Sequence, residues 1–181
     1  MAKKIGLTIV ALVFVFLGYV STREGKFRYE RSGIIEAPAE KIFPYISNFK
    51  LGVEWSPYEK KDPNMKKTYG GTDGEVGSTM DFEGNSDTGS GKLEVLKLVP
   101  NQSVEIKLTM LKPFFAENTV IYTLTPEGSG TRFSWAMIGD GGFMGKLMTT
   151  LIDCEAMVAG DFNKGIASLK TVVEGQRQST N

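Results

Sequence analysis

Residues 77–138 alternate apolar and polar positions in short runs, whereas residues 143–174 carry apolar positions at steps of three and four. The first pattern is typical of strands with one buried face, because successive side chains of a strand point to opposite sides. The second pattern describes one face of a single long α-helix. Predicted strands cover residues 27–36, 65–69, 79–83, 92–99, 104–110, 119–125 and 132–137.

Two of these segments contain irregularities. In the run 92–99, Leu93 and Val95 share one face while Leu96 and Leu98 share the other. One extra residue re-aims a strand, so a β-bulge is predicted here. In the long helix, Gly160 and Gly165 weaken the helical preference and predict a kink or break around residues 158–161.

Between the first and second predicted strands, the sequence favours two short helical pieces. Pro38 suits a helix start and opens residues 39–43, and a second piece covers residues 51–55 before Ser56-Pro57 stops it. The predicted fold class is therefore α+β, an antiparallel sheet of about six to seven strands curved around a long C-terminal helix. Such a sheet tends to leave a cavity between itself and the helix. A lipocalin-type barrel is the alternative fold, and the early helical pieces and the terminal helix argue against it.

The N-terminal segment is a separate element. Residues 5–20 form an uninterrupted apolar run behind Lys3 and Lys4, with a length between a signal-peptide core and a full membrane span. Residues 18–22 lack a convincing Ala-x-Ala cleavage pattern, so an uncleaved single-pass membrane anchor over residues 1–23 is preferred, and a cleaved signal peptide is the alternative. The two lysines favour a cytoplasmic N-terminus, which places the domain outside the cytoplasm (in the periplasm of a Gram-negative cell). Arg23 and other cations just beyond the run oppose that orientation.

Composition narrows the chemistry. Lys plus Arg equals Asp plus Glu at 21 each, which leaves no basic surplus for nucleic acid. The chain has no histidine and one cysteine, which excludes histidine-based catalysis, histidine metal sites and an internal disulfide, so no cofactor or metal is expected. Cys154 falls in the apolar stripe of the long helix and is predicted to pack as a small hydrophobe.

Several segments carry a family resemblance. Residues 36–43 (EAPAEKIF), 55–60 (WSPYEK), 62–66 (DPNMK), 111–114 (LKPF), 142–148 (GFMGKLM) and 161–170 (DFNKGIASLK) are involved. Together they resemble a membrane-linked branch of the SRPBCC superfamily, the START-like, helix-grip group often called polyketide cyclase/dehydrase. The resemblance covers residues 27–174 and implies the helix-grip fold for residues 24–176, with residues 177–181 as a disordered tail. Because this superfamily holds lipid carriers, hormone receptors, cyclases and regulators on one scaffold, it implies no single function.

The resemblance also implies a deep cavity between the concave face of the sheet and the long helix. Met and aromatic side chains make an adaptable apolar wall, and Tyr and Trp add donors, which suits a lipid, an acyl chain or a polyketide-like aromatic. Alternatively the same side chains fill a solid core. Asn118 is polar in phase with Val120 and Tyr122, so it either caps a sheet edge or contacts a ligand. The candidate ligand-binding residues are Trp55, Tyr58, Tyr69, Met80, Phe82, Phe115, Asn118, Tyr122, Trp135, Met137, Met144, Met148 and Leu151.

Three functions remain open from the sequence. The preferred function is a membrane-tethered or exported protein that binds a small apolar ligand, with its oligomeric state undetermined. A cyclase or dehydratase would need a positioned acid or base, for which Glu54, Glu117, Asp153, Asp161 and Tyr122 are candidates, although each also suits a solvated charge or a packed ring. An interaction or structural domain would show a filled core and an exposed apolar patch.

Overall fold

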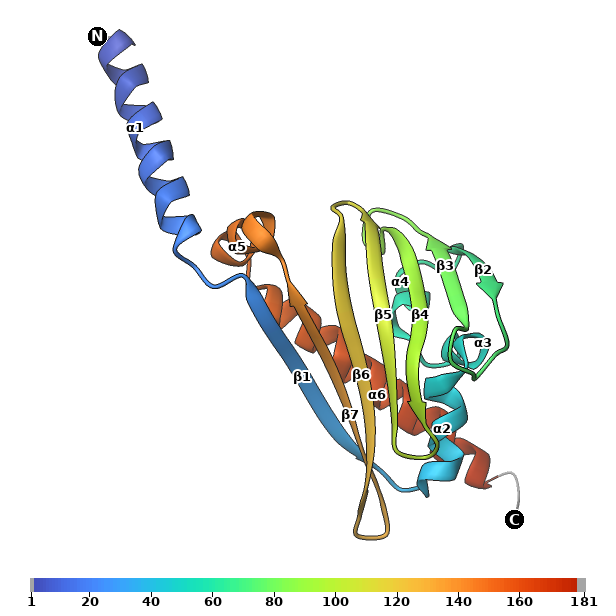
Figure 1. The fold of residues 1–181 in the computed structure, drawn as a ribbon. Coiled ribbons are helices and arrows are strands. Elements are labelled where there is room, and N and C mark those ends of the chain that lie inside the picture. The colour runs from blue at the N-terminus through green and yellow to red at the C-terminus, as the bar shows by residue number, and fades with distance from the viewer. Residues whose placement is uncertain (1, 179–181) are drawn as a thin grey trace.

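The computed structural model describes residues 2–178, in which seven strands form one antiparallel sheet in the order β1-β7-β6-β5-β4-β3-β2 (Figure 1). Each strand from β2 to β6 pairs with the next along the chain, and β7 pairs on its other side with β1. The predicted curved antiparallel sheet is confirmed. The strands are β1 (Lys26–Ile35), β2 (Lys66–Gly70), β3 (Thr79–Glu83), β4 (Ser90–Val99), β5 (Ser103–Lys112), β6 (Ala116–Glu127) and β7 (Gly130–Asp140).

The phase change in β4 is a break in strand register. Pairing between β4 and β5 shifts between Val95 and Lys97, which confirms the bulge predicted from the sequence. Val95 is 1% exposed, whereas the intervening Leu96 is 44% exposed. The extra residue therefore turns one leucine outward and lets the strand bend.

Three short helices follow β1: α2 (Ala39–Ser47), α3 (Phe49–Gly52) and α4 (Pro57–Lys61). The short helices after the first strand are confirmed, but the prediction for Ser56-Pro57 was wrong. These residues begin α4 instead of ending a helical piece. The Ser56 hydroxyl accepts a hydrogen bond from the backbone N–H of Tyr58 at 3.4 Å, and Pro57 occupies the first helical position. Proline is favourable there because that N–H would have no helical partner.

The long C-terminal helix is divided, but not at residues 158–161, where Gly160 and Gly165 led us to predict a break. It consists of α5 (Gly142–Leu151) and α6 (Cys154–Gln178). Ile152 has an extended backbone, and the Asp153 carboxylate accepts a hydrogen bond from the backbone N–H of Ala156 at 2.9 Å, which starts α6. The predicted break at residues 158–161 is therefore wrong, because Gly160 and Gly165 both lie inside the continuous α6.

The apolar face of α6 packs on the sheet. Phe162, Ile166, Leu169 and Val173 are between 0 and 8% exposed and join the main core cluster. α6 runs across one face of β1, β7 and β6, so the sheet grips the helix (Figure 1). α6 continues through Gln178, and residues 179–181 of the predicted tail lie outside the described residues.

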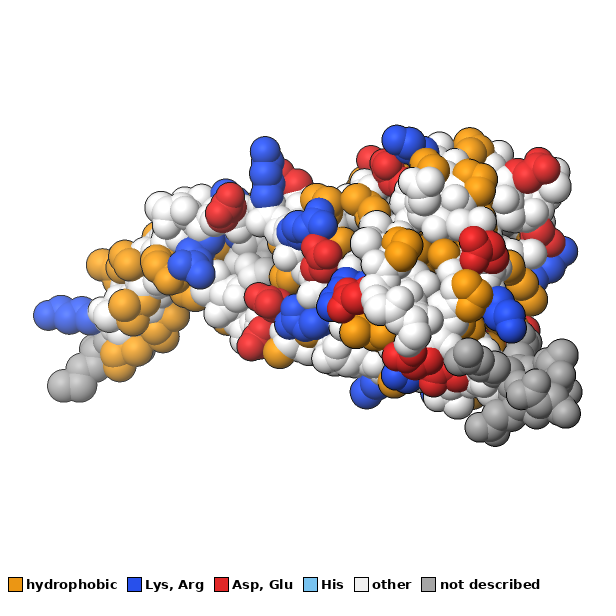
Figure 2. Space-filling view, turned by 90° about the horizontal axis from the view of Figure 1, so that it is seen from below, with side chains coloured by type: hydrophobic (Ala, Val, Ile, Leu, Met, Phe, Trp, Pro, Cys, Tyr) orange, Lys and Arg blue, Asp and Glu red, His pale blue; other side chains and the backbone are white. Residues whose placement is uncertain are grey.

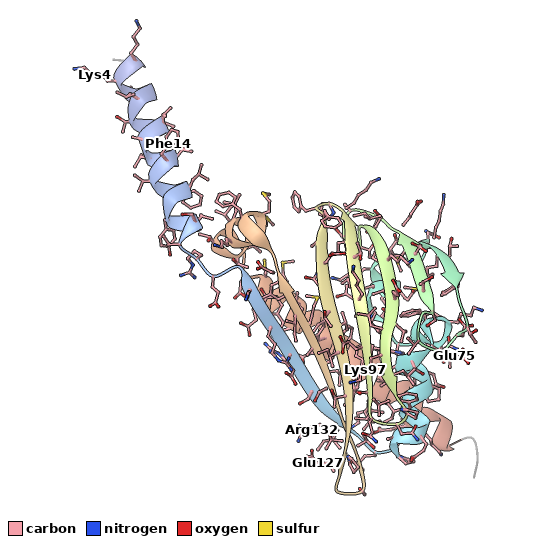
Figure 3. All side chains as sticks on the ribbon, viewed as in Figure 1. Lys4, Phe14, Glu75, Lys97, Glu127 and Arg132 are labelled. Carbon is pink, nitrogen blue, oxygen red and sulfur yellow. The ribbon has the colours of Figure 1, made fainter. Side chains whose placement is uncertain are left out.

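The N-terminal helix α1 (Ala2–Ser21) extends away from the sheet and exposes apolar side chains over most of its length (Figures 1 and 2). Lys4 and Phe14 project from it into open space (Figure 3). Among residues 2–178, Lys3–Ser21 is the helix long and apolar enough to cross a membrane, with a mean hydropathy of 2.1. A signal sequence would have the same properties.

Candidate ligand-binding cavity

A cavity of about 330 Å³ lies between the concave face of the sheet and helices α2, α3, α4 and α6. A completely filled core, which a purely structural domain would have, is therefore not observed. The sheet contributes Met80, Phe82, Leu93, Ile106, Leu108, Met110, Asn118, Val120, Tyr122, Trp135 and Met137 to the wall. The helices and their connections contribute apolar residues that include Tyr45, Ile46, Phe49, Trp55, Tyr58, Met65 and Phe162.

Strand register brings the sheet residues of the wall together. Leu108 of β5 lies opposite Asn118 of β6, and Ile106 lies opposite Val120. Because side chains two positions apart in a strand share a face, every second residue along this part of β5, β6 and β7 points into the cavity. The same rule places Tyr122 of β6 opposite Trp135 of β7.

Most of the sequence-predicted residues meet in this wall, and the others lie elsewhere. The wall contains Trp55, Tyr58, Met80, Phe82, Asn118, Tyr122, Trp135 and Met137. Tyr69 packs half-buried against the core beside the Lys50 ammonium. Phe115 is 70% exposed in the turn after β5, and Met144, Met148 and Leu151 lie on α5, so none of these four lines the cavity. The three α5 residues lie outside the wall because the break at Ile152 separates α5 from α6, the helix that covers the sheet.

Several wall residues were missed from the sequence. Leu108 and Met110 follow the same alternation as Val104 and Ile106, so strand phase alone could have found them. Phe162 was recognised only as part of the helix stripe. Phe49 begins the four-residue helix α3, and Met65 lies just before the five-residue strand β2. Elements this short give too little periodicity to indicate the direction of a side chain.

Four aromatic side chains of the cavity wall form a cluster. The Trp135 ring stacks on Phe162 with centroids 4.2 Å apart and meets the edge of Trp55 at 5.4 Å. Tyr122 contacts both tryptophans in edge-to-face geometry. The Trp55 indole N–H donates to the backbone carbonyl of Tyr45 at 2.8 Å, which ties the cluster to α2. Such packing makes this wall rigid.

The polar groups of the wall are few. Burial raises the pKa of the Tyr122 phenol far above its ordinary value, and burial followed by the nearby Asp161 charge does the same for Tyr58. Both hydroxyls therefore stay protonated at neutral pH and can donate hydrogen bonds. Asn118 adds one amide to an otherwise apolar strand face. These groups could orient the polar end of an apolar ligand.

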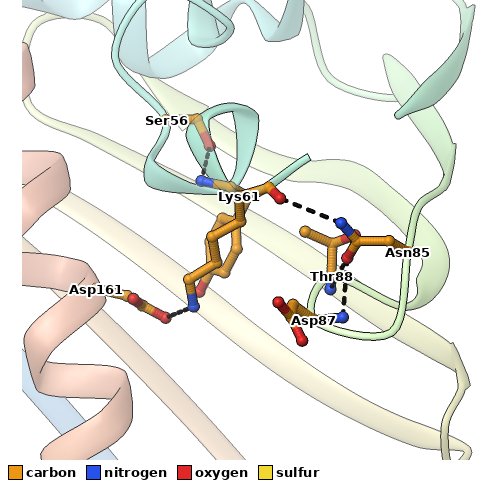
Figure 4. A network of polar contacts seen from close by, with 7 residues as sticks. Ser56, Lys61, Asn85, Asp87, Thr88 and Asp161 are labelled. Carbon is orange, nitrogen blue, oxygen red and sulfur yellow. Dashed lines mark hydrogen bonds and ion pairs between the residues drawn. The ribbon is translucent and has the colours of Figure 1, made fainter. Parts of the chain in front are cut away.

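The rim of the cavity is held by a polar network between α4, the β3–β4 turn and α6 (Figure 4). The Asn85 amide oxygen accepts from the backbone N–H groups of Asp87 at 2.8 Å and Thr88 at 3.2 Å, and its amide nitrogen donates to the Lys61 carbonyl at 3.1 Å. The Lys61 ammonium pairs with Asp161 at 2.6 Å. Asp87 and Thr88 belong to the cavity wall, and Asp87 is exposed, so the mouth lies beside this turn.

The candidate acids are mostly outside the cavity. Glu54, Glu117 and Asp153 are exposed, and Asp161 pairs with Lys61, so Tyr122 is the one of the five candidates in the wall. The carboxylates that do border the cavity are Asp87 at the mouth and Glu59, which pairs with Lys67. Within residues 2–178 there is no group of three or more His, Cys, Asp or Glu side chains that could hold a metal ion.

Comparison with solved structures shows the same fold at low sequence identity. A protein from Mesorhizobium loti aligns with a TM-score of 0.61 and 18% identity over 82% of this chain and 97% of its own. The Aha1 dimer from Colwellia psychrerythraea gives 0.58 and 20% identity over 82% and 96%. DynU16, from the dynemicin biosynthetic locus, gives 0.57 and 14% identity over 81% of this chain and 47% of its own.

No curated protein matches the chain. The family model described as polyketide cyclase / dehydrase and lipid transport matches residues 26–174, which includes the whole sheet and nearly all of α6. The chain therefore belongs to the polyketide cyclase/dehydrase and lipid transport family.

Proposed function

We propose that this protein is a membrane-tethered binder of one small apolar ligand, such as a lipid, an acyl chain or a polyketide-like molecule. The observation that carries the proposal is the cavity of about 330 Å³ with walls of Met, Leu, Ile, Val and aromatic side chains. Ligand pockets generally start near ~300 Å³ and combine an apolar lining with a few polar groups. Asn118 and the half-buried Tyr58 and Tyr122 are such groups.

The chain has a built-in reporter for this proposal. Its two tryptophans, Trp55 and Trp135, both line the cavity. A polyene fatty acid such as cis-parinaric acid accepts energy from tryptophan, so its binding in the cavity should quench both residues. We expect saturable quenching with sensitised parinarate emission and competition by unlabelled fatty acid. Quenching that rises linearly without saturation would contradict a cavity site.

A pair of matched variants distinguishes the cavity from the surface. Leu108→Phe adds a larger ring to the wall, whereas Leu96→Phe makes the same change on an exposed leucine of the same sheet. Leu108→Phe should weaken parinarate binding by about tenfold or more, since filling the space removes apolar contacts worth ~1.5–3 kcal/mol for one side chain. Leu96→Phe should bind like the original chain. Equal affinity in both variants would place the ligand outside the cavity.

The tether and the localisation are part of the same proposal. The apolar length of Lys3–Ser21 supports a single-pass anchor, and Lys3 and Lys4 at its start support a domain outside the cytoplasm. Alkaline carbonate should leave the full chain in the membrane fraction, and intact mass should show that residues 1–23 are retained. Protease added to spheroplasts should degrade the domain. A soluble product that has lost about twenty residues would establish the alternative of a cleaved signal peptide.

A cyclase or dehydratase is the second candidate, since the family description includes both activities. Tyr122 is the residue to test because its protonated hydroxyl belongs to the cavity wall. Under this candidate, Tyr122→Phe abolishes turnover of a polyketide-like substrate while parinarate binding persists. Under the preferred function, the original chain returns such a substrate unchanged.

A further inference from the structure

One end of the sheet combines the anchor, the cavity mouth and an apolar surface. The register of adjacent strands defines this end by the pairs Lys26↔Asp140, Asn118↔Gly139, Met110↔Ala116, Ser90↔Lys112, Glu83↔Ser90 and Lys66↔Glu83. α1, α5 and the β5–β6 turn lie together at this end (Figure 1). Arg132 and Glu127, which form an ion pair, mark the opposite end (Figure 3).

The apolar side chains at this end come from two separate segments. They are Leu111 at the end of β5, Phe114 and Phe115 of the β5–β6 turn, and Phe143, Met144, Leu151 and Ile152 of α5 and its end, and we call them the anchor-end surface. Their exposure ranges from 41 to 70%. Exposed hydrophobics elsewhere in the domain include Val76 in the β2–β3 connection and Leu96 of β4. Exposed apolar side chains gathered at one end of a domain are typical of an interaction site.

The connection to α1 fixes how far this end can lie from a membrane. α1 ends at Ser21 and β1 begins at Lys26, so only residues 22–25 separate them. Such a connection spans at most roughly 14 Å when fully extended. α5 also holds the end of α1, because the Lys146 ammonium donates to the Ser21 carbonyl at 3.1 Å and Val20 is fully buried.

We propose that the anchor-end surface docks into the interface of the bilayer that holds α1, so that the cavity mouth faces the membrane. The inference rests on the proposed tether. Cavity residues Thr88, Met110 and Asn118 lie at this same end, beside the exposed Asp87. A docked domain would therefore exchange its ligand directly with lipid. This end carries charges of both signs, Lys112 and Lys146 as well as Asp140 and Glu117, so insertion depends on apolar area more than on anionic lipid.

Spin labels on the full chain in lipid nanodiscs test the docking. The background variant Cys154→Ser removes the single cysteine, and Phe115→Cys and Met144→Cys each place one label on the anchor-end surface. Val76→Cys is the matched control, an exposed apolar position beside Glu75, which lies away from α1 (Figure 3). Labels at 115 and 144 should show low accessibility to a water-soluble nickel relaxant and high accessibility to oxygen, and the label at 76 the reverse.

The outcomes separate docking from tethering. If carbonate leaves the chain in the membrane but labels at 115 and 144 resemble the label at 76, the docking is wrong and the tether stands. If carbonate releases the chain, the tether fails and the docking fails with it. Spin–spin broadening at 115 would place a second copy of the chain on this surface and would also overturn the proposal.

Discussion

Because α6 packs closely on the sheet at one of its glycines and not at another, replacing each by alanine should change the stability in opposite directions. A Cβ at Gly165 would lie 2.5 Å from Cζ3 of Trp135 and 3.1 Å from Cδ of Pro57, whereas a Cβ at Gly160 would meet nothing within 4 Å. Trp135 is held between Phe162 and Trp55, so its ring has little freedom to retreat. Gly165→Ala and Gly160→Ala therefore differ in packing while sharing the same change in helix propensity.

The magnitudes follow from these two effects. Replacing glycine by alanine inside a helix stabilises it by ~0.8–1 kcal/mol. Overpacking a close-packed interior costs ~1–3 kcal/mol. Gly160→Ala should therefore raise the free energy of unfolding by about 1 kcal/mol. Gly165→Ala should lower it by up to ~2 kcal/mol, and the difference between the two variants is the packing cost alone.

Thermal unfolding of the full chain in one mild detergent, followed by near-ultraviolet circular dichroism, measures the difference. One kcal/mol corresponds to roughly 2–4 °C for a domain of this size. Gly160→Ala should melt a few degrees above the original chain and Gly165→Ala below it, with altered aromatic dichroism because Trp135 must move. Equal stabilisation by both substitutions would refute the close approach of α6 to Trp135.

Three further predictions concern the cavity and α6. Burial raises the pKa of the Tyr122 phenol in the folded protein above its value of about 10 in the unfolded chain. The protonated phenol therefore contributes its full stability below about pH 10, and this contribution is lost as the pH rises further. Tyr122→Phe should reduce the alkaline loss of stability measured by chemical denaturation. Burial and then Asp153 raise the pKa of the Cys154 thiol, so iodoacetamide should alkylate it more slowly than free cysteine at pH 8, and an equal rate would contradict this. Asn85→Ala should loosen the rim and speed parinarate release in stopped-flow measurements, whereas Gln102→Ala in the distant β4–β5 turn should leave the rate unchanged.

Much of the sheet could be predicted because strand alternation is a local signal. The position of Val104, Ile106 and Leu108 in the alternating run predicts that their side chains face the core, and all three pack there. Alternation also predicted that Asn118, Tyr122 and Trp135 share one wall, because paired residues of neighbouring strands point to the same face of a sheet.

The helical errors have non-local causes. Gly160 and Gly165 suggested a break, but burial of Phe162 and Ile166 holds α6 continuous, and Gly165 is what permits its contact with Trp135. The actual break depends on the extended Ile152 and the capping Asp153, a weaker sequence signal. Because the break lies at Ile152, Met144, Met148 and Leu151 do not reach the predicted site, and Met144 and Leu151 lie on the exposed anchor-end surface.

We propose above that an apolar ligand occupies the cavity between the sheet and α6. Photo-crosslinking tests it most directly: a diazirine-bearing fatty acid is supplied to the full chain in lipid nanodiscs, irradiated, and the modified residues are mapped by mass spectrometry. We expect adducts on wall residues such as Met80, Met110 and Met137, abolished by excess unlabelled fatty acid and reduced by Leu108→Phe. Adducts confined to α1 and the anchor-end surface, with none on the wall, would contradict it.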